Sequence, residues 1–191
     1  TPYDRWSQHP NIGFDLSVLD IYGALCHGAC LYPIKGVRGR LVPAECIDEF
    51  QLTIWNSVPS VVDVMAKRNQ LTSANLASLR LMTFCGEPLL PEHLDGIFAA
   101  RPDIKVHNTY GPTETTVSCT LLELTAQNYR KYCRNNVSFG EPIEGMTLTL
   151  ESRNNQSEGE IIISGPQVAH GYWGRPDLTD QVFSKKASYG G

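Results

Sequence analysis

The residues best suited to chemistry lie in one short run, Asn108-Thr109-Tyr110-Gly111-Pro112-Thr113-Glu114-Thr115-Thr116. An amide can donate and accept hydrogen bonds at the edge of a base, and an aromatic ring offers a flat face. A carboxylate beside hydroxyl groups suits a hard cation such as Mg²⁺. The run therefore predicts a small-molecule site. Two simpler interpretations stay open, namely Gly111-Pro112 as a plain turn and Glu114 as an acid favoured in the first turn of a helix.

Polar or small residues follow three predicted strands, in the runs Asn56–Ser60, Cys85–Pro88 and Asn108–Pro112. Because the carboxyl ends of parallel strands lie on one edge of a sheet, we expect these three runs to form one crevice. Gly86 and Gly111 would let the backbone approach a ligand closely.

The elements that position these runs can be predicted from hydrophobic patterning and from capping residues. Helices are expected at 15–25, 43–50, 60–68 and 91–100, and strands at 30–34, 52–55, 79–84 and 104–107. Ser60 is the expected cap of its helix. The alternation of strands and helices predicts an α/β fold, with a parallel sheet flanked by helices.

Beyond residue 136 the pattern changes to short strands at 139–142, 146–151 and 160–164, separated by turns rich in Gly, Pro and Asn. We expect an α/β subdomain over 1–136 and a small β-barrel-like subdomain over 137–183. Residues 153–157 are the expected polar hairpin tip, and 184–191 an expected disordered tail.

Composition excludes several classes of protein. The 191 residues are 41% hydrophobic and carry a net charge of -4, so no basic face predicts a nucleic-acid partner. No apolar run reaches the ~18 residues of a membrane span. The six cysteines form no CxxC pair, and we expect reduced thiols in a cytoplasmic protein. The chain begins with Thr1, and we expect no signal peptide and an origin within a larger protein.

Three motifs resemble those of the adenylate-forming (ANL) superfamily, which comprises amino-acid adenylation domains, acyl-CoA synthetases and luciferases. They are Phe14-Asp15-Leu16-Ser17, then Tyr110–Thr116, then Gly159–Gly165 with Val168–Trp173. The resemblance implies an ATP-dependent, AMP-forming ligase. A carboxylate attacks the α-phosphate of ATP and expels pyrophosphate, and the phosphopantetheine thiol of a peptidyl or acyl carrier protein then takes the acyl group.

The resemblance also implies a role for each matching residue. The residues that match nucleotide-binding positions are Gly86, Glu87, Asn108, Thr109, Tyr110 and Gly111. Thr113 and Glu114 match the catalytic positions that contact the phosphates, and Glu114 would also bind Mg²⁺. Asp15 would pair with the substrate's ammonium group, and the remaining amino-acid pocket would be formed by Leu16, Leu19, Asn56, Thr83, Cys85, Thr109 and Val117. Two alternatives stay open: Asp15 as a helix cap and Cys85 as a buried core thiol.

Within the superfamily the chain looks closest to D-alanine–carrier-protein ligases or to a nonribosomal peptide synthetase adenylation domain that selects a small amino acid. An acyl- or aryl-CoA ligase and a noncatalytic binding remnant of the fold are the alternatives, and Asp15 argues against the CoA ligase. The family's phosphate loop, its ribose-binding Tyr-x-Thr-Gly-Asp segment and its C-terminal lysine find no match in the sequence. The chain therefore resembles a central slice of the large domain, and we expect it to be inactive by itself.

Overall fold

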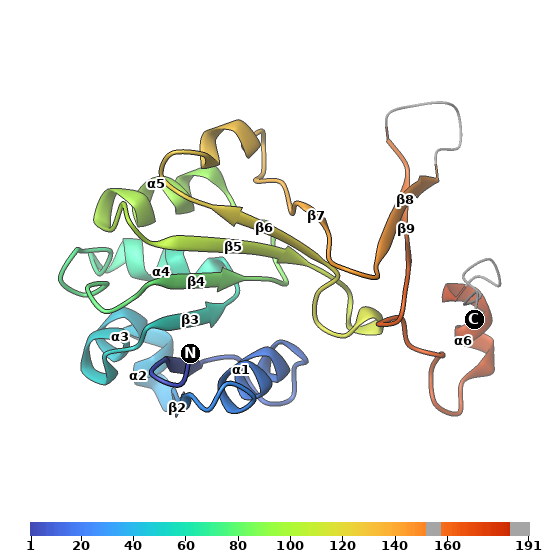
Figure 1. Cartoon of the computed structure of the whole chain (residues 1–191), viewed down its shortest axis with the longest axis horizontal. Coiled ribbons are helices and arrows are strands. Elements are labelled where there is room, and N and C mark those ends of the chain that lie inside the picture. The colour runs from blue at the N-terminus through green and yellow to red at the C-terminus, as the bar shows by residue number, and fades with distance from the viewer. Residues whose placement is uncertain (152–157, 184–191) are drawn as a thin grey trace.

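The computed structural model describes residues 1–151 and 158–183, which build a seven-stranded sheet and a separate two-stranded hairpin (Figure 1). The large sheet has the order β2-β1-β3-β4-β5-β6-β7. Its strands are β1 (Arg5–Gln8), β2 (Cys30–Pro33), β3 (Ile54–Ser57), β4 (Leu81–Phe84), β5 (Lys105–Tyr110), β6 (Thr120–Leu124) and β7 (Glu141–Pro142). Strands β1 to β5 pair in parallel, and β6 and β7 are antiparallel additions at one edge.

Six α-helices and two short 3-10 helices lie in the described part of the chain. The α-helices are α1 (Leu16–Leu25), α2 (Gly36–Leu41), α3 (Pro43–Phe50), α4 (Ser60–Lys67), α5 (Pro91–Ala100) and α6 (Pro176–Val182), and the 3-10 helices are η1 (Thr113–Thr115) and η2 (Tyr129–Tyr132). Both α3 and α5 begin at the proline that patterning predicts, since proline has the helical φ angle and needs no donor in the first turn. The expected cap was wrong: Pro59 is the N-cap of α4, and Ser60 is already helical.

The two faces of the sheet are packed differently. On one face Trp55, Met82 and Phe84 are fully buried, in a core shared with α3, α4 and α5. On the other face α1 covers a smaller buried cluster that contains Leu16, Cys85 and Val117. Because side chains alternate along a strand, Asn56 and its register partner Thr83 point to the α1 face, opposite to Trp55 and Met82.

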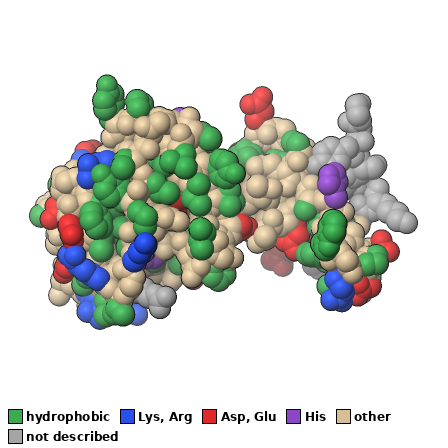
Figure 2. All heavy atoms as spheres, turned by 90° about the horizontal axis from the view of Figure 1, so that it is seen from below, with side chains coloured by type: hydrophobic (Ala, Val, Ile, Leu, Met, Phe, Trp, Pro, Cys, Tyr) green, Lys and Arg blue, Asp and Glu red, His purple; other side chains and the backbone are tan. Residues whose placement is uncertain are grey.

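Helix α1 has a buried stripe and an exposed one. Leu16, Asp20 and Ala24 are buried at a spacing of four residues, which is one face of a helix. On the outer side Tyr22 and Leu25 are exposed. The face seen from below in Figure 2 accordingly shows many hydrophobic side chains.

The hairpin of β8 (Thr147–Glu151) and β9 (Glu160–Ser164) lies apart from the large sheet, with α6 beyond it (Figure 1). The expected α/β architecture is confirmed, but patterning predicted none of β1, β6, α2 and α6. The division at residue 137 stays a prediction, and β7, which follows it, pairs with β6 of the large sheet. The expected hairpin tip and tail fall on 152–157 and 184–191, outside the described residues.

Candidate functional site

A cleft of about 750 Å³ lies at the carboxyl ends of β4 and β5. Two of the three strand exits predicted to converge do line it. Its lining residues are Gly86, Glu87, Pro88, Leu89, Asn108, Thr109, Tyr110, Gly111, Pro112, Lys131, Tyr132, Arg134, Asn136, Val137, Ser138 and Phe139. The third strand exit, Asn56–Ser60, does not line the cleft. It contacts a lining residue, because the backbone N–H of Ser60 donates to Glu87 Oε2 at 3.0 Å.

The ring of Tyr110 is held at the cleft by a second aromatic ring. It stacks on Phe139 with ring centroids 4.9 Å apart and an interplanar angle of 30°. Thr120 ties the two residues together, since its Oγ1 accepts from the Tyr110 N–H and donates to the Phe139 carbonyl oxygen at 2.8 Å. With 36% of its surface still exposed, Tyr110 keeps part of its ring available for a ligand.

Asn108 is buried and has a fixed amide orientation. Its Nδ2 donates to the carbonyl oxygen of Ser138 at 2.9 Å, and a carbonyl can only accept, so the nitrogen must be on that side. Among the described residues nothing donates to Asn108 Oδ1. Asn108 thus keeps an acceptor, which matches the exocyclic amino group of adenine and opposes the carbonyl that guanine carries at the same position.

Gly111 is required by close approach of the backbone. A Cβ at this position would lie 2.6 Å from the Cα of Ser118 and 2.9 Å from the nitrogen of Cys119. The neighbouring strand exit contains Gly86, whose φ of +89° favours glycine. Both glycines therefore shape the cleft wall through the backbone.

The turn after β5 carries Glu114 and two strained residues. Thr116 and Val117 have φ angles of +55° and +71°, which β-branched residues rarely adopt. Glu114 Oε1 accepts a hydrogen bond from the hydroxyl of Tyr172, which raises the pKa of that hydroxyl. Thr113 is exposed and Glu114 is partly buried.

The donor set around Glu114 fits Mg²⁺ bound together with a nucleotide. The described residues contain no group of three His, Cys, Asp or Glu side chains that could hold a metal by themselves. Mg²⁺ bound with substrate phosphates needs only one or two protein carboxylates. Glu114 supplies one, and its Oε2 has no hydrogen-bond partner among the described residues.

The positions predicted to form an amino-acid pocket gather on the α1 face of the sheet. Leu16, Cys85 and Val117 form one buried cluster, against which Leu19 packs. The Cys85 thiol lies 3.6 Å from the Val117 carbonyl oxygen. Two further positions come from the strands beneath: Thr83 is buried in β4, and Thr109 Oγ1 donates to the Phe84 carbonyl oxygen at 3.0 Å. Cys85 is a free and buried thiol, as the core interpretation expects, and its place beside a small substrate stays a prediction.

Asp15 is the N-cap residue of α1, but its side chain does not cap the helix. Its backbone is helical, and its side chain makes no capping hydrogen bond. Burial raises the pKa of the Cys85 thiol, and the charge of Asp15 contributes to the rise, so the carboxylate acts on this cluster. Asp15 thus stands at the N-cap position, as the cap alternative expects, but its carboxylate is not used for capping and remains available for another partner.

Asn56 is tied to a buried acid that sequence reasoning missed. Its Nδ2 donates to Asp20 Oδ1 at 2.9 Å and to the Leu16 carbonyl oxygen at 3.3 Å. Burial raises the pKa of Asp20 to about 8, against a lowering by the Asn56 hydrogen bond. Among the described residues, Asp20 Oδ2 and Asn56 Oδ1 have no hydrogen-bond partner. The sequence signal was the buried stripe of α1, in which Asp20 falls between Leu16 and Ala24.

The other residues that sequence reasoning missed come from later in the chain. The wall over 131–139 is built by backbone contacts, such as the Val137 N–H to the Leu89 carbonyl oxygen at 2.9 Å, that no local pattern reveals. Phe139, in a Phe-Gly pair, was predicted only as part of a strand. Tyr172 lies in the third motif, where no role was assigned to it.

The sequence comparisons match this chain to AMP-binding enzymes and to ligases that act on carrier proteins. The family of AMP-binding enzymes matches residues 1–173. The chain is 35% identical over 182 residues to the L-proline–[L-prolyl-carrier protein] ligase of Pseudomonas fluorescens, covering 92% of this chain and 36% of that protein. It is also 35% identical over 175 residues to the D-alanine–D-alanyl carrier protein ligase of Bacillus velezensis, covering 89% of this chain and 35% of that protein.

A solved structure agrees with these relatives. The Vibrio cholerae adenylation domain AlmE, in complex with glycyl-adenosine-5'-phosphate, superposes with a TM-score of 0.85 at 34% identity. The match covers 100% of this chain and 36% of that one, so the chain spans about a third of the length of its relatives.

The cysteines and the helices can be compared with what the sequence predicted. All six cysteines are free, and Cys46, Cys85 and Cys119 are buried. No helix in the described ranges is long and apolar enough to cross a membrane.

Proposed function

The chain belongs to the family of AMP-binding enzymes, and from that membership we propose that it forms the adenine wall and the amino-acid wall of an adenylation site. The whole protein would activate a small amino acid with ATP, giving aminoacyl-AMP and pyrophosphate. It would then pass the aminoacyl group to the phosphopantetheine thiol of a carrier protein. The relatives named as carrier-protein ligases support this reaction.

The observation that carries the proposal is the fixed amide of Asn108 at the cleft. Because Ser138 uses its Nδ2, Oδ1 is the atom left to accept the amino group of adenine. Tyr110, held by Phe139, would cover the base, and the backbone of Gly86 and Glu87 would line its edge. This arrangement favours adenine nucleotides over guanine nucleotides.

Thr113 and Glu114 are proposed to face the phosphates. Mg²⁺ held by Glu114 would neutralise the charge of the phosphates as the α-phosphate is attacked. Thr113 is exposed beside it and offers a hydroxyl donor. The carboxylate of the amino acid is the attacking group in this scheme, and pyrophosphate is the leaving group.

Asp15 is proposed to bind the ammonium group of the amino acid. It makes no capping bond, and its charge acts on the cluster of Leu16, Cys85 and Val117, where the substrate side chain would lie. Leu19, Asn56, Thr83 and Thr109 complete the proposed pocket. The division into units at residue 137 and a cytoplasmic location belong to the proposal, the latter supported by six free cysteines.

Nucleotide binding to the 191-residue chain tests the adenine wall. In a calorimetric titration AMP should bind, and GMP should bind at least about tenfold more weakly, the cost of one mismatched hydrogen bond. Asn108→Leu should remove the preference, and Gln127→Leu, which changes an exposed amide outside the cleft lining, should not. Equal binding of AMP and GMP to the unmodified chain would contradict the assignment.

ATP–pyrophosphate exchange by the full-length protein tests the amino-acid wall. Small amino acids should support exchange, and the corresponding acids without an amino group should not. Asp15→Ala should lower exchange at least about a hundredfold, since removing one partner of a buried ion pair costs about 3–5 kcal/mol. The exposed Asp180→Ala is the matched control. Exchange that survives Asp15→Ala would show that another group binds the ammonium.

A further inference from the structure

Residues 167–172, here called the strap, hold the Glu114 turn from the side of the hairpin. The backbone N–H of Ala169 donates to the Glu114 carbonyl oxygen at 2.7 Å. Thr116 Oγ1 donates to the Gln167 carbonyl oxygen at 3.1 Å. The hydroxyl of Tyr172 donates to Glu114 Oε1. Two contacts fix the backbone and hydroxyl of the turn, and the third fixes the carboxylate itself.

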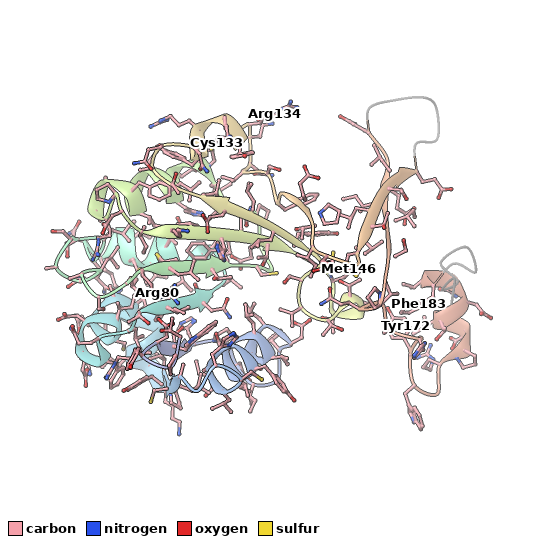
Figure 3. All side chains as sticks on the ribbon, in the orientation of Figure 1. Arg80, Cys133, Arg134, Met146, Tyr172 and Phe183 are labelled. Atoms are coloured by element: carbon pink, nitrogen blue, oxygen red, sulfur yellow. The ribbon has the colours of Figure 1, made fainter. Side chains whose placement is uncertain are left out.

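Tyr172 is held firmly from behind. Its backbone N–H donates to Thr179 Oγ1 of α6 at 2.9 Å. Its ring meets the ring of Phe183 edge to face, with centroids 5.5 Å apart and an angle of 74°. The side-chain view shows these two aromatic residues lying together beside α6 (Figure 3). Gly171 allows this contact, because a Cβ there would lie 2.4 Å from Thr179 Cγ2.

The turn needs such support because its backbone is strained. Thr116 and Val117 both have positive φ angles, and conformations of this kind persist only where the surroundings hold them. Val117 belongs to the amino-acid cluster, and Glu114 belongs to the phosphate side. A loose strap would therefore disturb both walls of the proposed site.

We propose that Tyr172 is a positioning residue, which holds one oxygen of Glu114 so that the other is presented to the cation of the bound nucleotide. The proposal rests on the proposed function and extends it to a residue outside the nucleotide and amino-acid walls. Glu114 Oε1 is used by the tyrosine, and Oε2 has no partner among the described residues, so a single oxygen is left in a fixed direction. The hairpin and α6 thereby act on the site through one hydroxyl group.

The first test needs no ligand. Tyr172→Phe keeps the ring against Phe183 and removes only the hydroxyl. Hydrogen exchange of the amides in residues 113–118 should become about fivefold faster in the 191-residue Tyr172→Phe chain, since one hydrogen bond between two half-buried side chains is lost. Trp173→Phe, a change of the adjacent and fully exposed ring, should leave exchange unchanged. Unchanged exchange in Tyr172→Phe would overturn the proposal.

The second test uses nucleotides as probes. For the unmodified chain, Mg²⁺ should increase the affinity for ATP. In Tyr172→Phe this increase should shrink about fivefold, while the affinity for AMP without metal stays the same. An unchanged effect of Mg²⁺ in Tyr172→Phe, or no effect of Mg²⁺ on the unmodified chain, would refute the positioning role. Absence of AMP binding to the unmodified chain would instead refute the proposed function, and the exchange measurement would still decide whether Tyr172 holds the turn.

Discussion

The two proposed walls of the candidate site, one for adenine and one for the amino acid, use opposite faces of the sheet and are built in opposite ways. On the adenine wall an open cleft of about 750 Å³ is bounded by fixed groups, with Asn108 held by Ser138 and Tyr110 held by Phe139. On the amino-acid wall Leu16, Cys85 and Val117 pack closely, and the polar residues beneath them are buried.

The difference shows where each wall gets its properties. Hydrogen bonds to backbone carbonyls and close-packed glycines fix the adenine wall, so its shape depends on geometry. The amino-acid wall has an acid with a raised pKa at its base, Asp20, in contact with a proposed pocket residue, Asn56. We therefore expect the amino-acid wall to respond to pH and to substitutions of buried charged residues. We expect the adenine wall to respond to substitutions that disturb the close approach of its backbone.

The largest expected effect is a pH dependence that arises from Asp20. The folded chain keeps a proton on this carboxyl group up to about pH 8, whereas the unfolded chain releases it near the ordinary value of 3.8. The folded state therefore binds more protons between these values, and the free energy of unfolding should fall as the pH rises through this range. The expected loss is on the order of 6 kcal/mol, since each pKa unit corresponds to about 1.4 kcal/mol, and it is measurable by urea unfolding at a series of pH values.

Asp20→Asn should flatten this pH dependence, because an amide resembles the neutral acid and does not ionise. The exposed Asp180→Asn should leave the slope in place. If the free energy of unfolding of Asp20→Asn still falls with pH, Asp20 does not hold a proton in the folded chain. The two walls would then not differ in their response to pH.

The next effect is on the adenine wall and depends on fit. Gly111→Ala should lower the free energy of unfolding by about 1–3 kcal/mol, since its Cβ would overlap backbone atoms that cannot move aside. It should also abolish AMP binding in a calorimetric titration. Gly13→Ala, where the nearest atom is 3.4 Å away, is the matched control. Normal AMP binding by Gly111→Ala would mean that the cleft does not depend on this close approach.

The smallest effect concerns Thr109, which lines the cleft and is also a proposed amino-acid position. Thr109→Val removes the hydrogen bond to the Phe84 carbonyl oxygen and keeps the shape. We expect a loss of about 1 kcal/mol in thermal or urea unfolding and less than a threefold change in AMP affinity. A large loss of AMP affinity would make the two walls one cooperative unit and would remove the distinction between them.

Local patterns predicted much of the fold, and the failures have a common cause. Helices α3 and α5 begin and end where patterning places them, because proline and apolar spacing act locally. Strand β5 was expected to end at His107 but continues to Tyr110, because β6 pairs with Asn108, Thr109 and Tyr110. That pairing comes from a strand that no local signal predicted.

The candidate site follows the same rule. The run from Asn108 to Thr116 could be predicted as a binding site from its residue types alone. Phe139 and Tyr172 act through contacts 29 and 58 residues away from Tyr110 and Glu114 respectively, and only the folded chain shows them. Asp20 lay within reach of sequence reasoning, since the stripe of Leu16 and Ala24 places it in the core, but a charged residue in a helix is normally assigned to the surface.

One measurement tests the account most directly: a map of backbone amide chemical shifts of the 191-residue chain as AMP is added. The account predicts shifts in residues 86–89, 108–112 and 131–139, with α1 unaffected, because the cleft is lined by residues of these three runs and by none of α1. Shifts confined to α1, or none in the two strand exits of the cleft, would contradict the assignment of the cleft to adenine.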